Sequence, residues 1–265
     1  MGKYSYLISQ MTWSFSRLRC FEQCPYRFLM SYIYPADEEP QFYAEYGLFV
    51  HRLLAGFYSG DIKPDLLVTK YITGYYQEVK PPPPTPEIGR KFFEQGLQYL
   101  KGLREKSFPY EVVAVEKEIS FHLYGYHFKG FIDLLLRDRD GRLIIVDHKS
   151  HPLKQRSNRK KPTKSDQELD EYLLQLYLYS LWAIQELNEE PAKLMFNCYR
   201  TGEIIEEEFD SRKMDKAMIW ARDLIRQIEA EEDYNPKLDY FPCRYICPVH
   251  DECEYYELGG KNGSM

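Results

Sequence analysis

The sequence predicts an α/β domain in which a mixed β-sheet is flanked by helices. Apolar, β-branched segments separated by turns predict strands, and they occupy 111–123, 126–137, 141–149, 193–200 and 203–210. A long amphipathic segment at 166–187 predicts a helix between the third and fourth of these strands. Helices, consecutive strands, a helix and further strands in this order give one α/β domain with a mixed sheet.

Further helices are expected on both sides of this core. Ser14 or Ser16 can cap the start of a helix that carries Phe21 and Phe28. Other helices are expected at 42–58, 87–105 and 212–231. The segment KPPPPTP at 80–86 cannot be helical or lie in a central strand, so we expect an exposed, extended connector there.

Length and composition limit the classes of protein to consider. The 265 residues, 44% of them hydrophobic, are enough for one sizeable core, and we expect a single domain over 1–258, with a core at about 87–210 and a flexible tail at 259–265. The net charge of −6 gives no global attraction to nucleic acid or membranes. No segment is apolar over the roughly 18 residues that a membrane span needs, and we expect a cytoplasmic protein.

The segment IIVDHKS at 144–150 combines a buried strand with ionisable residues at its end. Asp147 and Lys149 are two residues apart on that strand, so their side chains point the same way. If 139–141 form a three-residue loop, Asp133 on the preceding strand faces Asp147, and Gly141 takes the left-handed position that such a loop requires. A two-residue loop would instead set Asp133 opposite His148.

Two facing carboxylates repel each other unless a proton or a cation lies between them. Mg²⁺ or Mn²⁺, which prefer oxygen ligands, would relieve the repulsion between Asp133 and Asp147. A cation there could activate a water and stabilise charge on a phosphodiester, with Lys149 contacting the phosphate or the water. The alternative is a surface hairpin with scattered charges, or a structural ion pair at the end of the strand.

Several short motifs, taken in order, resemble the PD-(D/E)XK nuclease superfamily. They are SFSRLRCFEQCPYRF at 14–28, GLFVH at 47–51, VEKEISF at 115–121, GFID at 130–133, IIVDHKS at 144–150 and QLYLY at 175–179. The resemblance is to the branch that contains RecB- and AddB-type nuclease domains and the CRISPR-associated spacer-acquisition nucleases. It implies a restriction-endonuclease-like core and spans nearly the whole chain.

The resemblance also implies roles for individual residues. Asp133 and Asp147 would be metal ligands, with the backbone carbonyl of His148 as a third contact and His51 as an additional ligand. Lys149 would be the catalytic lysine. Glu116 would be a further catalytic residue, although Glu118 lies two residues away on the same strand face. Gln175 and Tyr179, at i and i+4 on one helix face, would lie near the active site towards the DNA.

A basic segment begins five residues after Lys149. Its six cations are Lys154, Arg156, Arg159, Lys160, Lys161 and Lys164. Such a run is commonly a solvated, disordered loop. Its place next to a phosphodiester site indicates phosphate binding, and a loop that orders on DNA would satisfy both readings.

Three of the six cysteines lie close together near the C-terminal end. Cys243, Cys247 and Cys253 need a distant fourth thiol, for which Cys24 is the candidate and Cys20 the fallback. The resemblance implies a structural [4Fe–4S] cluster that joins the two ends of the chain. Its usual spacing is one residue shorter between the first two of these cysteines. The alternatives are a Zn²⁺ site, using Cys24 or His250, or buried free thiols.

The sequence therefore predicts a Mg²⁺- or Mn²⁺-dependent DNA nuclease, and the resemblance favours an exonuclease on single-stranded or end-exposed DNA. Recombination, repair, phage replication and CRISPR adaptation are all compatible settings. The chain has no G-x-x-x-x-G-K-[ST] motif, so it would act alone or with a separate helicase, recombination or adaptation protein. The alternatives are a non-catalytic DNA-binding or scaffold subunit and an Fe–S redox or sensor protein.

Overall fold

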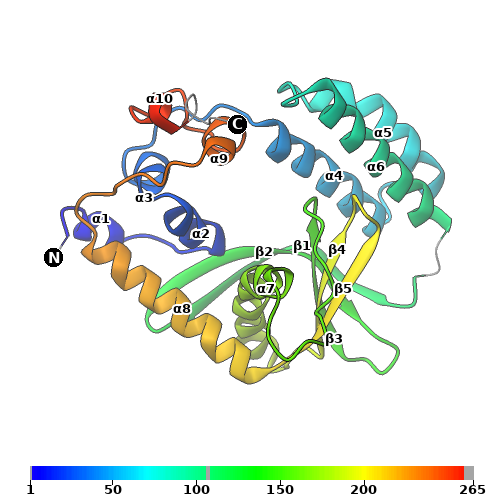
Figure 1. Cartoon of the computed structure of the whole chain (residues 1–265). Helices are drawn as coiled ribbons and strands as arrows, with labels where there is room; N and C mark the ends of the chain where they lie inside the picture. The colour runs from blue at the N-terminus through cyan, green and yellow to red at the C-terminus, as the bar shows by residue number, and fades with distance from the viewer. Residues whose placement is uncertain (1, 106–107, 260–265) are drawn as a thin grey trace.

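The computed structural model describes residues 2–105 and 108–259, and its centre is one five-stranded sheet in the order β1-β2-β3-β4-β5 (Figure 1). The strands are β1 (Glu111–Leu123), β2 (Tyr126–Arg137), β3 (Leu143–Lys149), β4 (Lys193–Cys198) and β5 (Glu203–Glu208). Strands β3 and β4 are parallel, and the other neighbours are antiparallel. The sheet is therefore mixed, as predicted.

Helices surround this sheet. They are α1 (Ser5–Ser9), α2 (Phe15–Gln23), α3 (Pro25–Phe28), α4 (Phe42–Tyr58), α5 (Pro64–Glu78), α6 (Pro86–Glu105), α7 (Lys164–Trp182), α8 (Ser211–Ala230), α9 (Tyr240–Tyr245) and α10 (Tyr256–Gly259), with π-helical turns at Leu29–Ile33 and Ala183–Leu187. None of the described helices is long and apolar enough to cross a membrane. The predicted tail at 259–265 lies, beyond its first residue, outside the described part of the chain.

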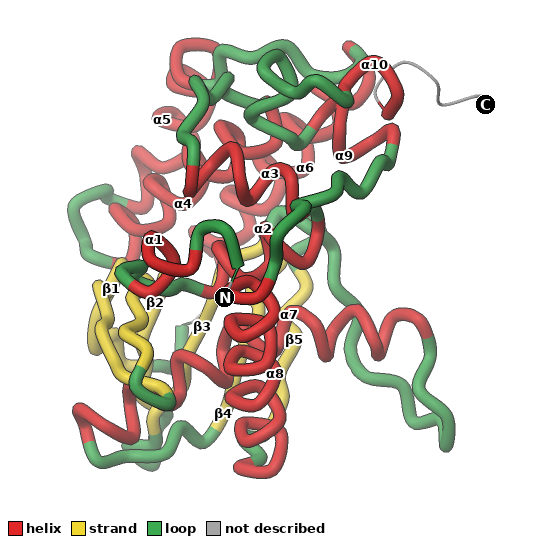
Figure 2. The backbone as a smooth tube through the Cα atoms, turned by 90° about the vertical axis from the view of Figure 1, so that its left-hand side faces the viewer, coloured by secondary structure: helices red, strands yellow, loops and turns green. Residues whose placement is uncertain are grey.

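The helices form two groups around the sheet. The first group is α2, α7 and α8, and its apolar residues share one core with a face of the sheet. The second group is α4, α5 and α6, which form a separate core that Tyr199 joins from the end of β4. Figures 1 and 2 show these groups on either side of the strands, with α8 along the outside of α7. Helices therefore flank, on both sides, the strands that carry the candidate site residues.

Two helices differ from expectation. The helix expected to run through Phe28 is interrupted at Cys24, because Cys24 is extended and Pro25 begins a new helix with the Cys24 sulfur accepting from the Arg27 N–H. Helix α5 was not predicted, since its valine, isoleucine, threonines and tyrosines favour strands. Tertiary packing decides there: a Cβ at Gly74 would lie 2.8 Å from the Phe49 ring, so α4 and α5 approach closely.

The hairpin between β2 and β3 has the predicted three-residue loop. The Asp138 N–H donates to the Arg142 carbonyl at 3.0 Å, and Gly141 has φ of 77°. The ladder ends at the pair Leu134–Val146, and the same register continued by one step sets Asp133 opposite Asp147. The register that brings the two acids together is therefore confirmed.

The sheet bends where Asp133 lies. In β2, Ile132 packs in the core shared with α7, whereas Leu134 packs in a separate cluster on the other face with Val146. Leu135, three residues after Ile132, returns to the first core, so simple alternation fails across Asp133. Glu116 on the neighbouring strand has φ of 47° at the same level, which marks the bend in β1. The bend therefore sets Asp133 between the two faces of the sheet.

We expect Gly141→Ala to lower the free energy of unfolding by about 1 kcal/mol, because a Cβ strains the left-handed backbone that the loop needs. Gly102→Ala in α6 is the matched control, since its added Cβ meets nothing within 4 Å in an ordinary helix. It should raise stability by about 0.5–1 kcal/mol. Urea unfolding of both variants measures this, and shifts of the same sign would contradict the loop geometry.

Candidate functional site

The bend in β2 and the end of β3 collect most of the residues that the sequence singles out. The structure brings together Glu116 from β1, Asp133 from β2, Asp147, His148 and Lys149 from β3, His51 from α4, and Gln175 and Tyr179 from α7. Helix α4 reaches the site from one side, and α7 reaches it from the other (Figure 1).

Asp133 is buried and is held by nitrogen donors. One of its oxygens accepts from the His148 backbone N–H at 2.6 Å and lies 3.5 Å from His51 Nδ1. Burial opposes the charge, but these two histidines hold the pKa of Asp133 at about 2. Burial also opposes a charge on His51, and the acids at 133, 147 and 116 outweigh it and raise the His51 pKa. Asp133 and His51 therefore each favour the charged form of the other.

Three side chains form a candidate metal site at this point. Ligand atoms of His51, Glu116 and Asp133 lie within 4.8 Å of one another, and no other such group is found among the described residues. Burial and the Asp133 charge raise the pKa of Glu116. Glu118 instead lies 3.7 Å from Lys129 Nζ, so the structure favours Glu116 of the two glutamates.

Asp147 and Lys149 form the other half of the site. Lys149 Nζ lies 2.8 Å from Asp147 Oδ2 and donates to Gln175 Oε1 at 2.9 Å. The Gln175 amide donates to Asp147 Oδ1 at 2.8 Å and to the Tyr179 hydroxyl at 3.3 Å. Burial raises the pKa of Asp147. Burial opposes a charge on Lys149, but the Asp147 carboxylate raises the Lys149 pKa, so the lysine stays charged.

The residues fit a divalent cation. Asp147 Oδ2 is buried and has no hydrogen bond directed at it, although Lys149 lies within ion-pair distance. His51 Nε2 is 2.9 Å from the His148 carbonyl oxygen, so two of the expected ligand groups are in direct hydrogen-bond contact. Carboxylate and carbonyl oxygens with one imidazole suit Mg²⁺ or Mn²⁺. The chemistry of the donor set therefore agrees with the expected metal.

The His148 side chain points away from this site. Its Nδ1 lies 3.0 Å from the Asn197 amide nitrogen, and its ring stacks on Tyr58. Burial lowers its pKa to about 4, so the ring is neutral. Only the backbone N–H and carbonyl of His148 lie at the site, as expected for a residue that contributes through its carbonyl.

Sequence reasoning missed three contacts that shape the site. A Cβ at Gly130 would lie 2.7 Å from the Tyr179 ring, so only glycine lets the tyrosine reach its position over β2. Lys149 Nζ lies 5.4 Å from the centre of the Tyr172 ring and 5.9 Å from the centre of the Phe196 ring, within cation–π distance of both. The glycine directly before the FID segment was the available signal for the first contact.

The basic segment is an anchored loop that joins β3 to α7. Leu153 is buried, and Ser157 donates to Asp166 from both its N–H and its hydroxyl. The Gln155 amide pairs with the N–H and carbonyl of Glu206, which covers the exposed edge of β5. These contacts fasten the first half of the loop to β5 and to the start of α7. Figure 2 shows it extending with the start of α7 to one side of the molecule.

The six cations of this loop divide into two kinds. Arg156 points inward, with Nη2 2.6 Å from Asp170 and Nε 2.8 Å from Glu207. Its guanidinium is thus already used within the protein. The others are exposed and, in the described part of the chain, have no ion-pair partner: Lys154, Arg159, Lys160, Lys161 and Lys164.

The cysteines at the two ends of the chain surround one cavity. A cavity of about 460 Å³ is lined by Cys24, Cys243, Cys247 and Cys253, and α9 and α10 lie beside α3 in Figure 1. The Tyr26 hydroxyl donates to Glu254 at 3.0 Å, which also joins the two ends. None of the six cysteines, all of which are described, forms a disulfide. Cys20 is buried in the main core, and burial raises its pKa to about 12.

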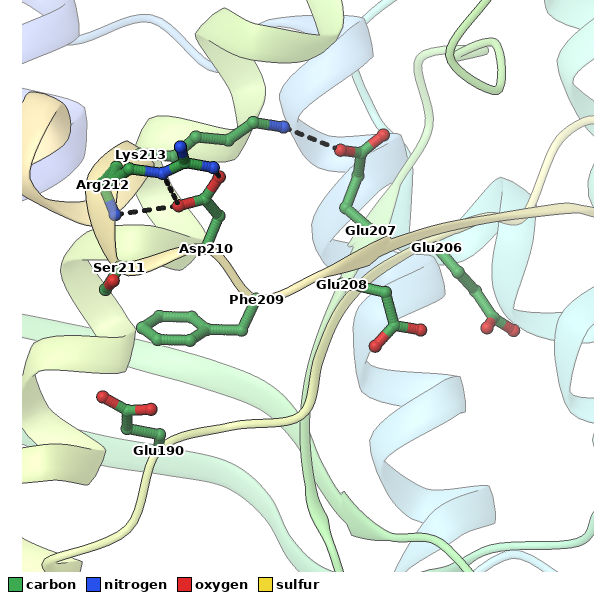
Figure 3. Close-up of a pocket in the computed structure, with 9 residues that line it drawn as sticks. All are labelled: Glu190, Glu206, Glu207, Glu208, Phe209, Asp210, Ser211, Arg212 and Lys213. Atoms are coloured by element: carbon green, nitrogen blue, oxygen red, sulfur yellow. Dashed lines mark hydrogen bonds and ion pairs between the residues drawn. The ribbon is translucent and has the colours of Figure 1, made fainter. Parts of the chain in front are cut away.

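A larger cavity, of about 640 Å³, lies between the end of β5 and the start of α8 (Figure 3). Acidic residues dominate its lining: Glu190, Glu206, Glu207, Glu208 and Asp210. Lys213 pairs with Glu207 and Arg212 with Asp210, as Figure 3 shows. Lys193 also pairs with Glu206 and lies 3.8 Å from Glu208. The lining carries five acids and two cations, so its net charge is negative and disfavours phosphate.

A family model and solved structures are similar to this chain. A crystal structure described as "Putative exonuclease" from Eubacterium rectale matches with a TM-score of 0.52 at 11% identity, covering 86% of this chain and 85% of the other. A structure described as SSO0001 matches with a TM-score of 0.38 at 15% identity, covering 93% and 87%. No curated protein matches the chain. The model of the PD-(D/E)XK nuclease superfamily matches residues 12–254, and the chain belongs to that superfamily.

Proposed function

We propose that this chain is a Mg²⁺- or Mn²⁺-dependent DNA nuclease that acts as an exonuclease on single-stranded or end-exposed DNA. The observation that carries the proposal is the joining of two groups at one bend of the sheet. One is the candidate metal site of His51, Glu116 and Asp133, and the other is the buried Asp147–Lys149 pair. Acidic ligands next to a charged lysine suit hydrolysis of an anionic ester.

The cation would be held by Asp133, Asp147, His51 and the His148 carbonyl, with Glu116 beside them. When bound, it supplies Lewis acidity and a more acidic water. Lys149 stays protonated beside Asp147 and provides a fixed positive charge for the phosphate. Gln175 holds both members of this pair through one amide, so it is a positioning residue.

The wider proposal concerns the substrate and partners. The five exposed cations at 154–164 begin close to Lys149, so they would bind the phosphate backbone of DNA. The motif order supports the RecB- and AddB-like branch, with roles in recombination, repair, phage replication or CRISPR-related processing. A separate helicase or a recombination or adaptation protein would then deliver the DNA.

The cysteine cavity would hold a [4Fe–4S] cluster with a structural role. Four thiols line a single cavity between α3 and α9, where the two chain ends meet. Cysteine sulfurs are the ligands that such clusters use, and a link between distant residues restricts the unfolded chain.

Asp147→Ala should reduce cleavage at least about 100-fold, because it removes a ligand and the partner of Lys149. End-labelled single- and double-stranded DNA with Mn²⁺, Mg²⁺ or EDTA is the assay, and Asp140→Ala on the exposed loop is the control. Cleavage that survives Asp147→Ala or EDTA would contradict the assignment. DNA binding without cleavage by folded wild type would favour the scaffold-subunit alternative.

Gln175→Leu should lower cleavage about 10- to 100-fold while the protein stays folded, since the amide orients Asp147 and Lys149. The metal concentration for half-maximal cleavage should rise. Gln167→Leu, on the exposed face at the start of the same helix, should change neither quantity. If the two substitutions had equal effects, the loss would come from a general change in the helix, and the Gln175 amide would have no specific role.

Cys247→Ser should lower soluble yield, the melting temperature and the iron content of anaerobically prepared protein. Cys20→Ala is the control for iron content, because Cys20 does not line the cavity. Iron and sulfide analysis with thermal melting tests this. Zinc in place of iron, or a cluster-free protein with an unchanged melting temperature, would contradict the structural cluster.

A further inference from the structure

Arg200 lies at the same end of the strands as Lys149, beyond the carboxyl ends of β3 and β4. The last residue of β4, Cys198, pairs with Lys149 in parallel register, and Arg200 follows two residues later. The Tyr199 N–H donates to the Lys149 carbonyl at 3.2 Å, and Arg200 Nη1 donates to the Ser150 carbonyl at 3.3 Å. The guanidinium is thus tied to the residue that follows the proposed catalytic lysine.

The guanidinium is held rigidly by helix α6. It lies 3.4 Å from the centre of the buried Phe92 ring. Arg200 Nε and Nη2 both donate to Gln95 Oε1, at 3.0 and 2.7 Å. These bonds and the one to Ser150 use three of the five N–H donors of an arginine, so two stay available.

The charge of Arg200 has no acidic partner. Its three hydrogen bonds go to neutral oxygens, and no carboxylate of a described residue lies within ion-pair distance. Arg156 and Arg137, which are also half-buried, both pair with glutamates. Burial lowers the pKa of Arg200, which shows that desolvation is not offset there. An anion would supply the missing charge.

A groove of about 390 Å³ opens beside Arg200, between α6 and the turn from β4 to β5. Gln98 and Thr201 add polar groups to its lining, and Glu94 is its one acid among the described residues. A Cβ on Gly102 or Gly202 would meet nothing within 4 Å, so the groove is open at both walls.

We propose that Arg200 binds a backbone phosphate of the substrate strand, one that neighbours the scissile phosphate, in this groove. The inference rests on the proposed nuclease function and deepens it. An arginine fork with two free donors and no acid partner matches a phosphate, and its link to Ser150 sets the site at the catalytic edge. Arg200 is a substrate-positioning residue, and Gln95 orients it.

The test compares Arg200→Met, which keeps the stem on Phe92 but removes the charge, with Arg139→Met on the loop at the opposite edge of the sheet. Binding of a fluorescent single-stranded oligonucleotide is measured in Ca²⁺ over a series of KCl concentrations. Arg200→Met should bind about 10-fold more weakly, and its log–log salt slope should fall by about 0.7. In Mn²⁺ its KM should rise while kcat stays within about 3-fold of wild type. Arg139→Met should match wild type.

Two further variants separate binding from folding. Gln95→Leu should weaken DNA binding less than Arg200→Met, and the double variant should be no weaker than Arg200→Met alone. Arg200→Lys keeps the charge without the fork, so it should retain the salt slope but not the full affinity. If Arg200→Met does not melt as a folded protein, these two variants carry the test.

The outcomes distinguish this proposal from the nuclease proposal. Wild type that binds and cleaves DNA, with an unchanged slope in Arg200→Met, would overturn the role of Arg200 alone. Wild type that neither binds nor cleaves would overturn both. Competition with inorganic phosphate tests whether Arg200 instead binds free anions. Phosphate binding that depends on Arg200, without any change in oligonucleotide affinity in the variant, would also overturn the proposal.

Discussion

The burial of Asp133 and Asp147 on adjacent strands is the constraint on which the rest of the structure depends. Asp133 is 8% exposed and Asp147 is 4% exposed, and two buried acids this close cannot both stay ionised without compensating charge. The fold supplies positive charge from His51 on α4 and Lys149 on β3, and the Gln175 amide from α7 adds a hydrogen bond to Asp147. Helices α4 and α7 each contribute one of these groups, His51 and Gln175, to the site.

Connectivity follows from the same constraint. Parallel pairing of β3 with β4 needs a crossover connection, and α7 provides it while it presents Gln175 to the end of β3. The crossover begins with the basic loop, so the loop cations start where the catalytic strand ends. The parallel pairing also brings Arg200 to the edge occupied by Lys149. One topological choice thus places the lysine, the loop and the proposed phosphate contact together.

Local patterns predicted the parts of the site that depend on local rules. Gly141 in a three-residue loop fixed the register of the two acids, and the helical spacing of 42–58 placed His51 on α4. The choice of Glu116 over Glu118 could not be made locally, because it depends on the left-handed backbone at Glu116 where the sheet bends. Strand alternation fails at that bend, so a strict two-residue period gives the wrong faces there.

Other features were hidden for different physical reasons. Helix α5 has a composition that favours strands, and packing of Tyr71 and Tyr75 on α4 and α6 overrides it. The inward turn of Arg156 depends on acids at Asp170 and Glu207, which are distant in sequence. Charge counting alone therefore assigned six cations to DNA, and three-dimensional pairing leaves five of them exposed.

The distribution of charge indicates on which side of the basic loop the proposed nuclease would bind DNA. Net charge is −6, so DNA attraction must be local, and screening at physiological salt limits it to about 8 Å. Arg156 and Gln155 fasten the inner side of the loop to Glu207 and Glu206, next to the acidic cavity in Figure 3. The exposed cations lie on the loop's outer side. The anchoring acids are neutralised by Arg156, Lys213 and Lys193, so the inner side of the loop offers no free cation to a phosphate backbone, and the unpaired cations are the ones that such a backbone would meet.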